Sequence, residues 1–76
     1  MNYDVLLDVK GLNCPLPILK AKKVLNTMSS GQILKVLATD PSTTKDFQTF
    51  VKYSGDKLLN HFTDPERIFT FFLEKR

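Results

Sequence analysis

The sequence predicts a two-layer α/β sandwich, in which a four-stranded mixed sheet carries two helices on one face. Three observations predict it: the chain has only 76 residues, strand-like and helix-like apolar spacings follow one another along it, and glycines and prolines separate them. A chain of this length builds one core, since domains hold roughly 50–200 residues. We therefore expect residues 1–76 to form a single domain with the order βαβαββ.

Residues 3–9 are rich in Val and Leu and predict a buried strand that Gly11 ends. A helix is expected from about Pro15, because a proline is tolerated in the first turn, where its missing N–H would have no partner. The helix is expected to end at Ser30, with Gly31 in the left-handed position after it. Its apolar side chains recur at helical spacing: Ile18, Ala21, Leu25 and Met28.

Residues 33–39 predict the second strand. Asp40 followed by Pro41 then predicts a second helix, with the aspartate as its N-cap and the proline in its first turn. Gly55 is expected to end that helix. Its apolar face carries Phe47, Phe50 and Val51 at positions i, i+3 and i+4.

Two further strands are expected at residues 57–63 and 67–74, joined by a turn at residues 64–66, where Asp precedes Pro. A strand–helix–strand unit makes a parallel pair, whereas this hairpin is antiparallel, so the sheet is mixed. The last strand holds three aromatic residues, of which alternating members should pack under the helices and the others should lie on the surface: Phe69, Phe71 and Phe72.

Composition excludes several classes of protein. Hydrophobic residues at 42% and charged residues at 25% exclude a disordered chain. A net charge of +3 is too small for a dedicated nucleic-acid binder, and no apolar run approaches the ~20 residues of a membrane span. The first residues show no secretory pattern, so a cytoplasmic location is expected. One cysteine and one histidine exclude an intrachain disulfide and a cysteine-based zinc site.

Cys14 is the residue best placed for chemistry, because it lies between a predicted strand end and a predicted helix start. The partial positive charge of a helix N-terminus favours an anion, so we expect the pKa of this thiol to fall below its usual value of about 8.5. Pro15 and Pro17 stiffen the turn, and Gly11 lets the backbone bend before it. The prolines leave a small set of backbone donors near the sulfur: the N–H groups of Cys14, Leu16 and Ile18.

The residues themselves also allow a purely structural cysteine. A lone cysteine in a small intracellular domain is often a buried small hydrophobe. Spacing alone does not decide between the two roles.

The motif Gly-Leu-Asn-Cys-Pro-Leu-Pro at residues 11–17, followed by Lys22 and Lys23, resembles the TusA-like sulfur carrier family, whose mark is Cys-Pro-x-Pro at the first helix. The likeness continues through residues 28–31 and 38–41, with residues 43–46 behind them, and covers nearly the whole chain. The resemblance implies the same two-layer sandwich.

The resemblance also implies a function. Cys14 would accept a sulfane sulfur as a persulfide from a cysteine desulfurase or a rhodanese-like donor and relay it to an acceptor protein, with Gly11, Pro15 and Pro17 supporting the motif. The sulfur would serve 2-thiolation of a tRNA wobble uridine, or molybdenum cofactor synthesis, thiosulfate uptake or sulfur oxidation. No metal or cofactor is implied. The protein would be a shuttle, a sulfurtransferase-type carrier rather than an autonomous enzyme, for which a monomer suffices.

Two positions depart from the family pattern beside the cysteine, where partners must dock. Leu16 stands where many members carry an acidic residue, and Asn13 stands where arginine is common in the tRNA-thiolation branch. Asp40 and Asp46 match family positions and are interpreted as helix-capping and helix-dipole residues. Three lysines resemble basic docking positions or form an ordinary solvated face: Lys22, Lys23 and Lys45.

An alternative function is a non-catalytic binding or regulatory module, for example one that contacts RNA, with Cys14 structural. The strands show no aromatic-and-glycine RNA-binding signature, so stable nucleic-acid binding is not expected. A thiol–disulfide oxidoreductase would need the second cysteine of a Cys-x-x-Cys site.

Overall fold

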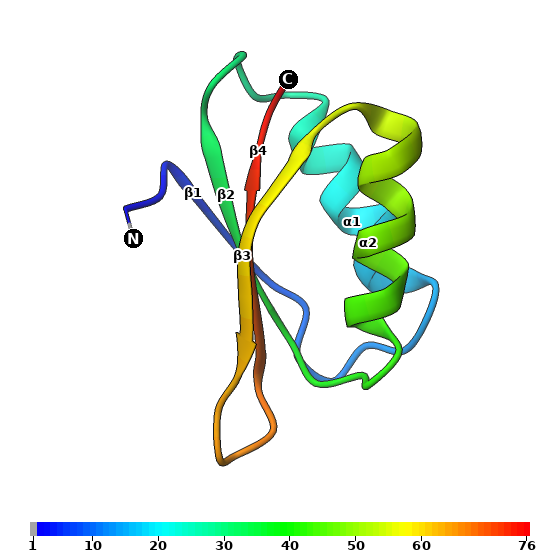
Figure 1. Ribbon diagram of the computed structural model, residues 1–76. Coiled ribbons are helices and arrows are strands. Elements are labelled where there is room, and N and C mark those ends of the chain that lie inside the picture. The colour runs from blue at the N-terminus through cyan, green and yellow to red at the C-terminus, as the bar shows by residue number, and fades with distance from the viewer. Residues whose placement is uncertain (1) are drawn as a thin grey trace.

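The computed structural model describes residues 2–76, and the elements follow one another in the order that the sequence predicts. The two helices lie side by side on one face of the sheet (Figure 1). The two-layer sandwich is therefore confirmed. The elements are β1 (Val5–Asp8), α1 (Leu16–Leu25), β2 (Ile33–Ala38), α2 (Thr43–Ser54), β3 (Lys57–Thr63) and β4 (Phe69–Glu74).

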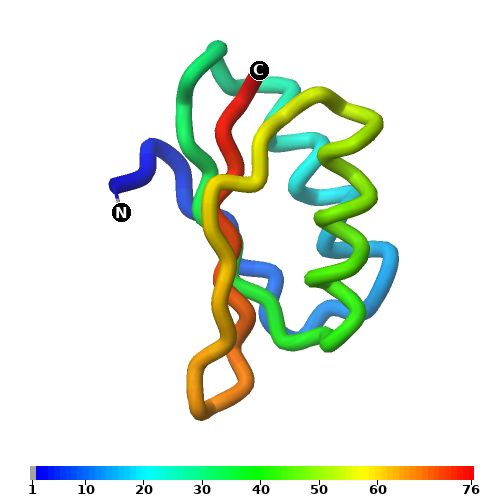
Figure 2. The backbone as a smooth tube through the Cα atoms, viewed as in Figure 1, coloured from blue at the N-terminus to red at the C-terminus, as the bar shows by residue number. Residues whose placement is uncertain are grey.

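The strands form one mixed sheet in the spatial order β1-β2-β4-β3. β1 and β2 are parallel, as expected for a strand–helix–strand unit, and β4 is antiparallel to both of its neighbours. The last strand of the chain therefore runs through the interior of the sheet, between β2 and β3 (Figure 2).

The core lies between the helices and the sheet. Alternate residues of β2 are fully buried against the helices, and α2 contributes Phe47, which is 0% exposed. The ring of Phe47 packs on that of Phe71 in β4, with 4.8 Å between the centroids. Phe71 thus lies under the helices, as the alternation in β4 predicts. The β2 residues in this core are Leu34, Val36 and Ala38.

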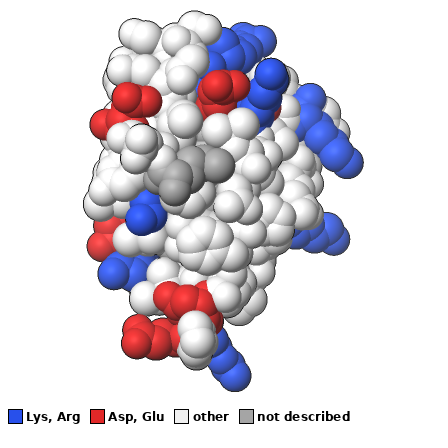
Figure 3. Space-filling model, turned by 60° about the vertical axis from the view of Figure 1, so that its left-hand side comes forward, with Lys and Arg blue, Asp and Glu red and all other residues white. Residues whose placement is uncertain are grey.

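The opposite face of the sheet has no helix over it, and one aromatic residue there differs from the expectation. Phe72 is only 4% exposed although it points away from the helices. The ammonium group of Lys35 lies 5.7 Å from its ring centre, and the ring of Phe62 lies 6.4 Å away, so neighbouring side chains cover it. Uncharged side chains occupy most of the middle of this side of the molecule, and charged ones lie mostly toward its margins (Figure 3).

The first helix is shorter than the sequence predicts, because α1 ends at Leu25 rather than at Ser30. Beyond it, the backbone N–H of Thr27 donates to the carbonyl of Val24 at 2.9 Å, so the chain tightens into turns of three residues. Gly31 does adopt a positive φ of 87°, but in the turn that enters β2.

The second helix begins later than expected, at Thr43, and its N-cap is Ser42 rather than Asp40. The Asp40 carboxylate still organises the start, because Oδ1 accepts the backbone N–H and the hydroxyl of Ser42, each at 3.0 Å. Gly55 ends α2 with a φ of 84°, as predicted. Among residues 2–76, no helix is long and apolar enough to cross a membrane.

Candidate functional site

The candidate site is built where two loops meet at one end of the sheet. One loop follows β1 and carries Cys14, and the other follows β2 and carries Asp40. Because β1 and β2 are neighbouring parallel strands, their carboxyl ends lie side by side and both loops turn there toward the helices (Figure 1).

Two hydrogen bonds join these loops. The backbone N–H of Gly11 donates to the hydroxyl of Thr39 at 2.9 Å, and that of Cys14 donates to Oδ2 of Asp40 at 2.6 Å. Gly11 has a φ of 83°, which glycine adopts without strain. Pro15 directly precedes α1, so Cys14 stands at the start of a helix as predicted.

The Cys14 side chain is exposed, which excludes the interpretation of this residue as a buried small hydrophobe. Two of the three backbone donors that we expected to serve its sulfur have other partners, however. The N–H of Cys14 is bonded to Asp40, and the N–H of Leu16 donates to the carbonyl of Asn13 at 2.9 Å. Neither group therefore serves the sulfur here.

Carboxylates at the start of α2 set the charge around the thiol. Hydrogen bonding to the Asp46 carboxylate raises the pKa of Cys14, and loss of hydration at the sulfur, the Asp46 charge and the Asp40 charge raise it further. A hydrogen bond from Ser42 acts in the opposite direction. The expectation of a lowered pKa is wrong, because it considered the N-terminus of α1 without the acidic residues that the fold places opposite it.

We predict that Cys14 is alkylated by iodoacetamide more slowly in the folded protein than in the urea-unfolded chain at the same pH. A raised pKa leaves less thiolate at any pH below it, and the thiolate is the nucleophile. The midpoint of the rate against pH should lie higher in the folded protein. A lower midpoint would show that the field of α1 prevails over the carboxylates.

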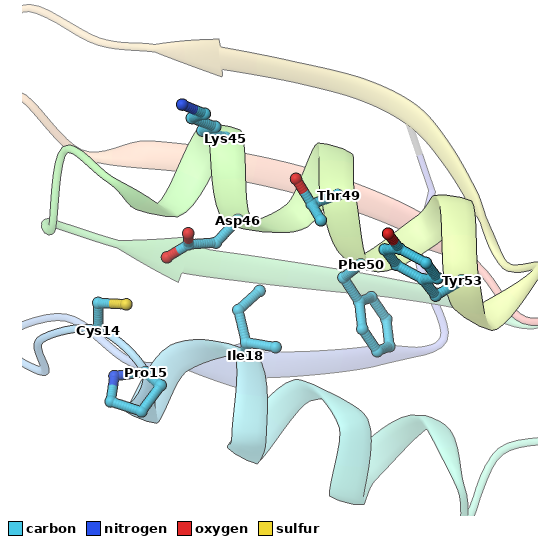
Figure 4. Close-up of a pocket in the computed structure, with 8 residues that line it drawn as sticks. All are labelled: Cys14, Pro15, Ile18, Lys45, Asp46, Thr49, Phe50 and Tyr53. Carbon is cyan, nitrogen blue, oxygen red and sulfur yellow. The ribbon is translucent and has the colours of Figure 1, made fainter.

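A groove of about 370 Å³ opens beside the sulfur, between α1 and α2. In Figure 4 the Cys14 side chain lies at one end of this groove, across from Asp46, while Phe50 and Tyr53 lie toward the other end. Tyr53 is 86% exposed, so it adds an accessible aromatic ring to that end of the groove. The groove is lined by Cys14, Pro15, Ile18, Lys45, Asp46, Thr49, Phe50 and Tyr53.

A second hollow of about 330 Å³ continues the first along the helices, and both share Ile18, Phe50 and Tyr53. We call the two together the interhelical groove. Among the residues that the structure describes, no cluster of three or more histidine, cysteine or acidic side chains could hold a metal ion.

The four residues predicted to dock partners lie at different places relative to the groove. Lys45 lines the groove beside Cys14, and Lys22 lines its continuation. Lys23 is exposed but lines neither hollow. Leu16, 45% exposed, lies in the first turn of α1 next to the motif.

Sequence reasoning missed part of the site. It gave no functional role to Ser42 or Tyr53, and it assigned Asp46 only to the helix dipole. A signal was available, because Asp46, Thr49, Phe50 and Tyr53 are spaced i, i+3, i+4 and i+7, which places them on one face of a helix. Ser42 carried no comparable signal.

The fold and the site together define a small α/β domain that presents one exposed thiol beside a groove, with no second cysteine in its sequence. Residues 5–75 match the family described as sulfurtransferase TusA. The chain belongs to this family of sulfur carrier proteins.

Individual relatives agree with this assignment. The chain is 60% identical over 58 residues, 76% of each chain, to the sulfur carrier protein TusA of Allochromatium vinosum. It is 44% identical over 75 residues, 99% of each chain, to the putative sulfur carrier protein YrkI of Bacillus subtilis. The crystal structure of a SirA-like protein from Desulfitobacterium hafniense has the same fold, with a TM-score of 0.83 at 19% identity over 93% of this chain and 96% of that one.

Proposed function

We propose that this protein carries sulfane sulfur as a persulfide on Cys14. A cysteine desulfurase or a rhodanese-like protein supplies the sulfur, and an acceptor protein receives it. The observation that carries the proposal is that the cysteine of the family's motif is exposed at the end of a groove, where a second protein can reach it. Membership of a sulfur carrier family supports the same role.

The chemistry needs no more than a thiolate and ordinary exchange at divalent sulfur. The Cys14 thiolate attacks the outer sulfur of the donor persulfide, so a new sulfur–sulfur bond forms on Cys14 and the donor leaves as a thiolate. An acceptor thiolate then attacks the outer sulfur of the Cys14 persulfide and removes it. No metal or cofactor takes part in this scheme.

The residues of the motif hold the sulfur in place. Gly11 is bonded to Thr39 and Cys14 to Asp40, while the buried ring of Pro17 fixes the first turn of α1 to the core. Pro15 begins the helix and forms part of the groove wall. These contacts support a defined direction of approach for a partner.

The interhelical groove is the proposed docking surface for the donor and the acceptor, with Leu16 beside it. Its apolar wall suits an apolar partner segment, and Lys22 and Lys45 favour an acidic one. The delivered sulfur serves 2-thiolation of a tRNA wobble uridine or another sulfur-trafficking pathway. We further propose a cytoplasmic monomer that binds no nucleic acid stably.

The proposal is tested by incubating the protein with a cysteine desulfurase and cysteine and measuring its intact mass without reductant. A gain of about 32 Da that disappears on reduction is expected, because persulfidation adds one sulfur reversibly. The Cys14→Ser variant should show no gain. An unmodified protein after exposure to both donor classes would contradict the proposal and favour the non-catalytic binding module.

We predict that Lys22→Glu and Lys45→Glu each slow sulfur transfer from the desulfurase by about tenfold at low salt, because electrostatic attraction mainly sets association rates. The difference should largely vanish near 0.5 M salt, where charges are screened within a few ångströms. Transfer rates at both salt concentrations check this.

Lys23→Glu and Lys57→Glu are matched controls, because neither side chain lines the interhelical groove. Equal slowing by all four substitutions would show that net charge, and not the groove, governs docking.

A further inference from the structure

The Ser42 hydroxyl links the two carboxylates that lie near Cys14. Oγ of Ser42 lies 3.0 Å from Oδ1 of Asp40 and 3.4 Å from Oδ2 of Asp46. Asp40 in turn accepts the N–H of Cys14, and Asp46 shares the groove wall with the sulfur (Figure 4). Asp46 raises the pKa of Cys14 and Ser42 lowers it, so both side chains act on the thiol.

The Ser42 hydroxyl has one proton and three acceptors to choose from. While Cys14 is a thiol, the carboxylates of Asp40 and Asp46 are the charged acceptors and take that proton. Once the sulfur is an anion, it becomes a third charged acceptor, and the hydroxyl can turn toward it.

A sulfur anion at this position gains from such a donor, since only the N–H of Ile18 remains of the three backbone donors expected near it. The N–H groups of Cys14 and Leu16 are bonded elsewhere, to Asp40 and to Asn13. The charged groups that line the groove next to the sulfur are Asp46 and Lys45, and both come from α2.

We propose, on the basis of the carrier function above, that Asp46 and Ser42 handle the Cys14 proton during sulfur transfer. The Asp46 carboxylate accepts the thiol proton as the sulfur attacks and returns it to the departing thiolate of the donor. The Ser42 hydroxyl donates to the sulfur of Cys14 while that sulfur is an anion. Both are therefore catalytic residues of the carrier.

The step balances. The S–H bond of Cys14 breaks and an O–H bond forms on Asp46. The thiolate then forms a bond to the outer sulfur of the donor persulfide as the donor's own sulfur–sulfur bond breaks. The donor leaves with that electron pair as a thiolate, which takes the proton from Asp46 and becomes a thiol. The carboxylate is restored, and no external oxidant or reductant is consumed.

Two reactions of the same sulfur separate proton transfer from simple electrostatics. Alkylation by iodoacetamide needs only a thiolate, whereas uptake of sulfur from glutathione persulfide also requires a proton for the leaving thiolate. For Asp46→Asn at pH 7 we expect faster alkylation, because a nearby charge that disfavours the thiolate is gone. We expect sulfur uptake to become about tenfold slower, because the proton carrier is gone.

Ser42→Ala should slow both reactions, because the anion loses its donor, and Ser42→Thr should restore both by keeping the hydroxyl. Glu66→Gln in the β3–β4 turn and Ser30→Ala before β2 are matched controls that should change neither rate, since neither side chain lines the groove. Circular dichroism of each variant establishes that it is folded.

If Asp46→Asn accelerates both alkylation and sulfur uptake, the inference is overturned, and Asp46 acts on the thiol only through its charge. Unchanged rates in Ser42→Ala would overturn the role of the hydroxyl. These outcomes differ from failure of the proposed function, in which wild-type protein takes up no sulfur from either persulfide or desulfurase.

Discussion

Phe47→Ala is expected to lower the free energy of unfolding by about 3–5 kcal/mol, which is the range for removing a buried phenylalanine ring. Phe47 is 0% exposed and contacts the rings of both Phe71 and Phe50. Since a domain of this size is stable by only about 4–11 kcal/mol, this loss is a large fraction of the total. Urea unfolding should show a lower midpoint with an unchanged slope.

Phe62→Ala is the matched control, because it removes the same ring from the opposite face of the sheet. Phe62 is 48% exposed, so a loss below about 1.5 kcal/mol is expected. A larger loss of unfolding free energy for Phe62→Ala than for Phe47→Ala would contradict the assignment of the main core to the helix-covered face of the sheet.

Asp40→Ala is expected to slow sulfur loading of Cys14 by about ten- to a hundredfold, because a displacement of about 1 Å in a reacting group can have an effect of that size. The substitution removes the acceptor of the Cys14 N–H and of both Ser42 donors, so the two loops of the site are no longer joined through it. Loading is measured by intact mass against time.

Asp64→Ala separates this effect from general destabilisation. Oδ1 of Asp64 accepts the backbone N–H groups of Glu66 and Ile68 in the β3–β4 turn, so its loss also breaks a turn held by a carboxylate. We expect Asp64→Ala to lower thermal stability but to leave loading unchanged. Equal loss of loading in both variants would mean that the Asp40 bonds have no special role at the sulfur.

The same bonds predict a dependence of stability on pH. Hydrogen bonds from the N–H of Ser42 and from that of Cys14 lower the pKa of Asp40 below its ordinary value of 3.8. A carboxyl whose pKa is lower in the folded state stabilises the fold above its unfolded pKa, and the contribution is lost as pH falls through the folded pKa. The difference in thermal midpoint between wild type and Asp40→Asn should therefore be largest above pH 4 and shrink at lower pH.

The order of the elements could be predicted because its signals are local. Prolines and glycines separate the segments, and alternation within each segment distinguishes strand from helix. The early end of α1 was missed because the turns after Leu25 preserve an apolar residue, Met28, at helical spacing, although the backbone is no longer a regular helix. The insertion of β4 between β2 and β3 has no local signal at all.

The site, too, was predicted only in part. The position of Cys14 before a helix follows from its neighbours in the chain, and the structure confirms it. The electrostatic surroundings of Cys14 do not follow from its neighbours in the chain. Asp40 lies 26 positions further along and is brought close to Cys14 only by the pairing of β1 with β2. Asp46, from the helix that follows Asp40, has the largest effect in raising the pKa of Cys14, and the charge of Asp40 adds to it.

The sulfur and the groove beside it lie on the outer side of the helices, whereas the buried side chains of the same helices, such as Ala21, Leu25 and Phe47, pack toward the sheet. If partners dock in the groove as proposed, exchanging Leu16, Lys22 or Tyr53 is expected to alter which proteins bind without removing a buried side chain from the core. On this proposal, a single fold could be adapted to different recipients by changes at its surface, because its stability depends on other side chains.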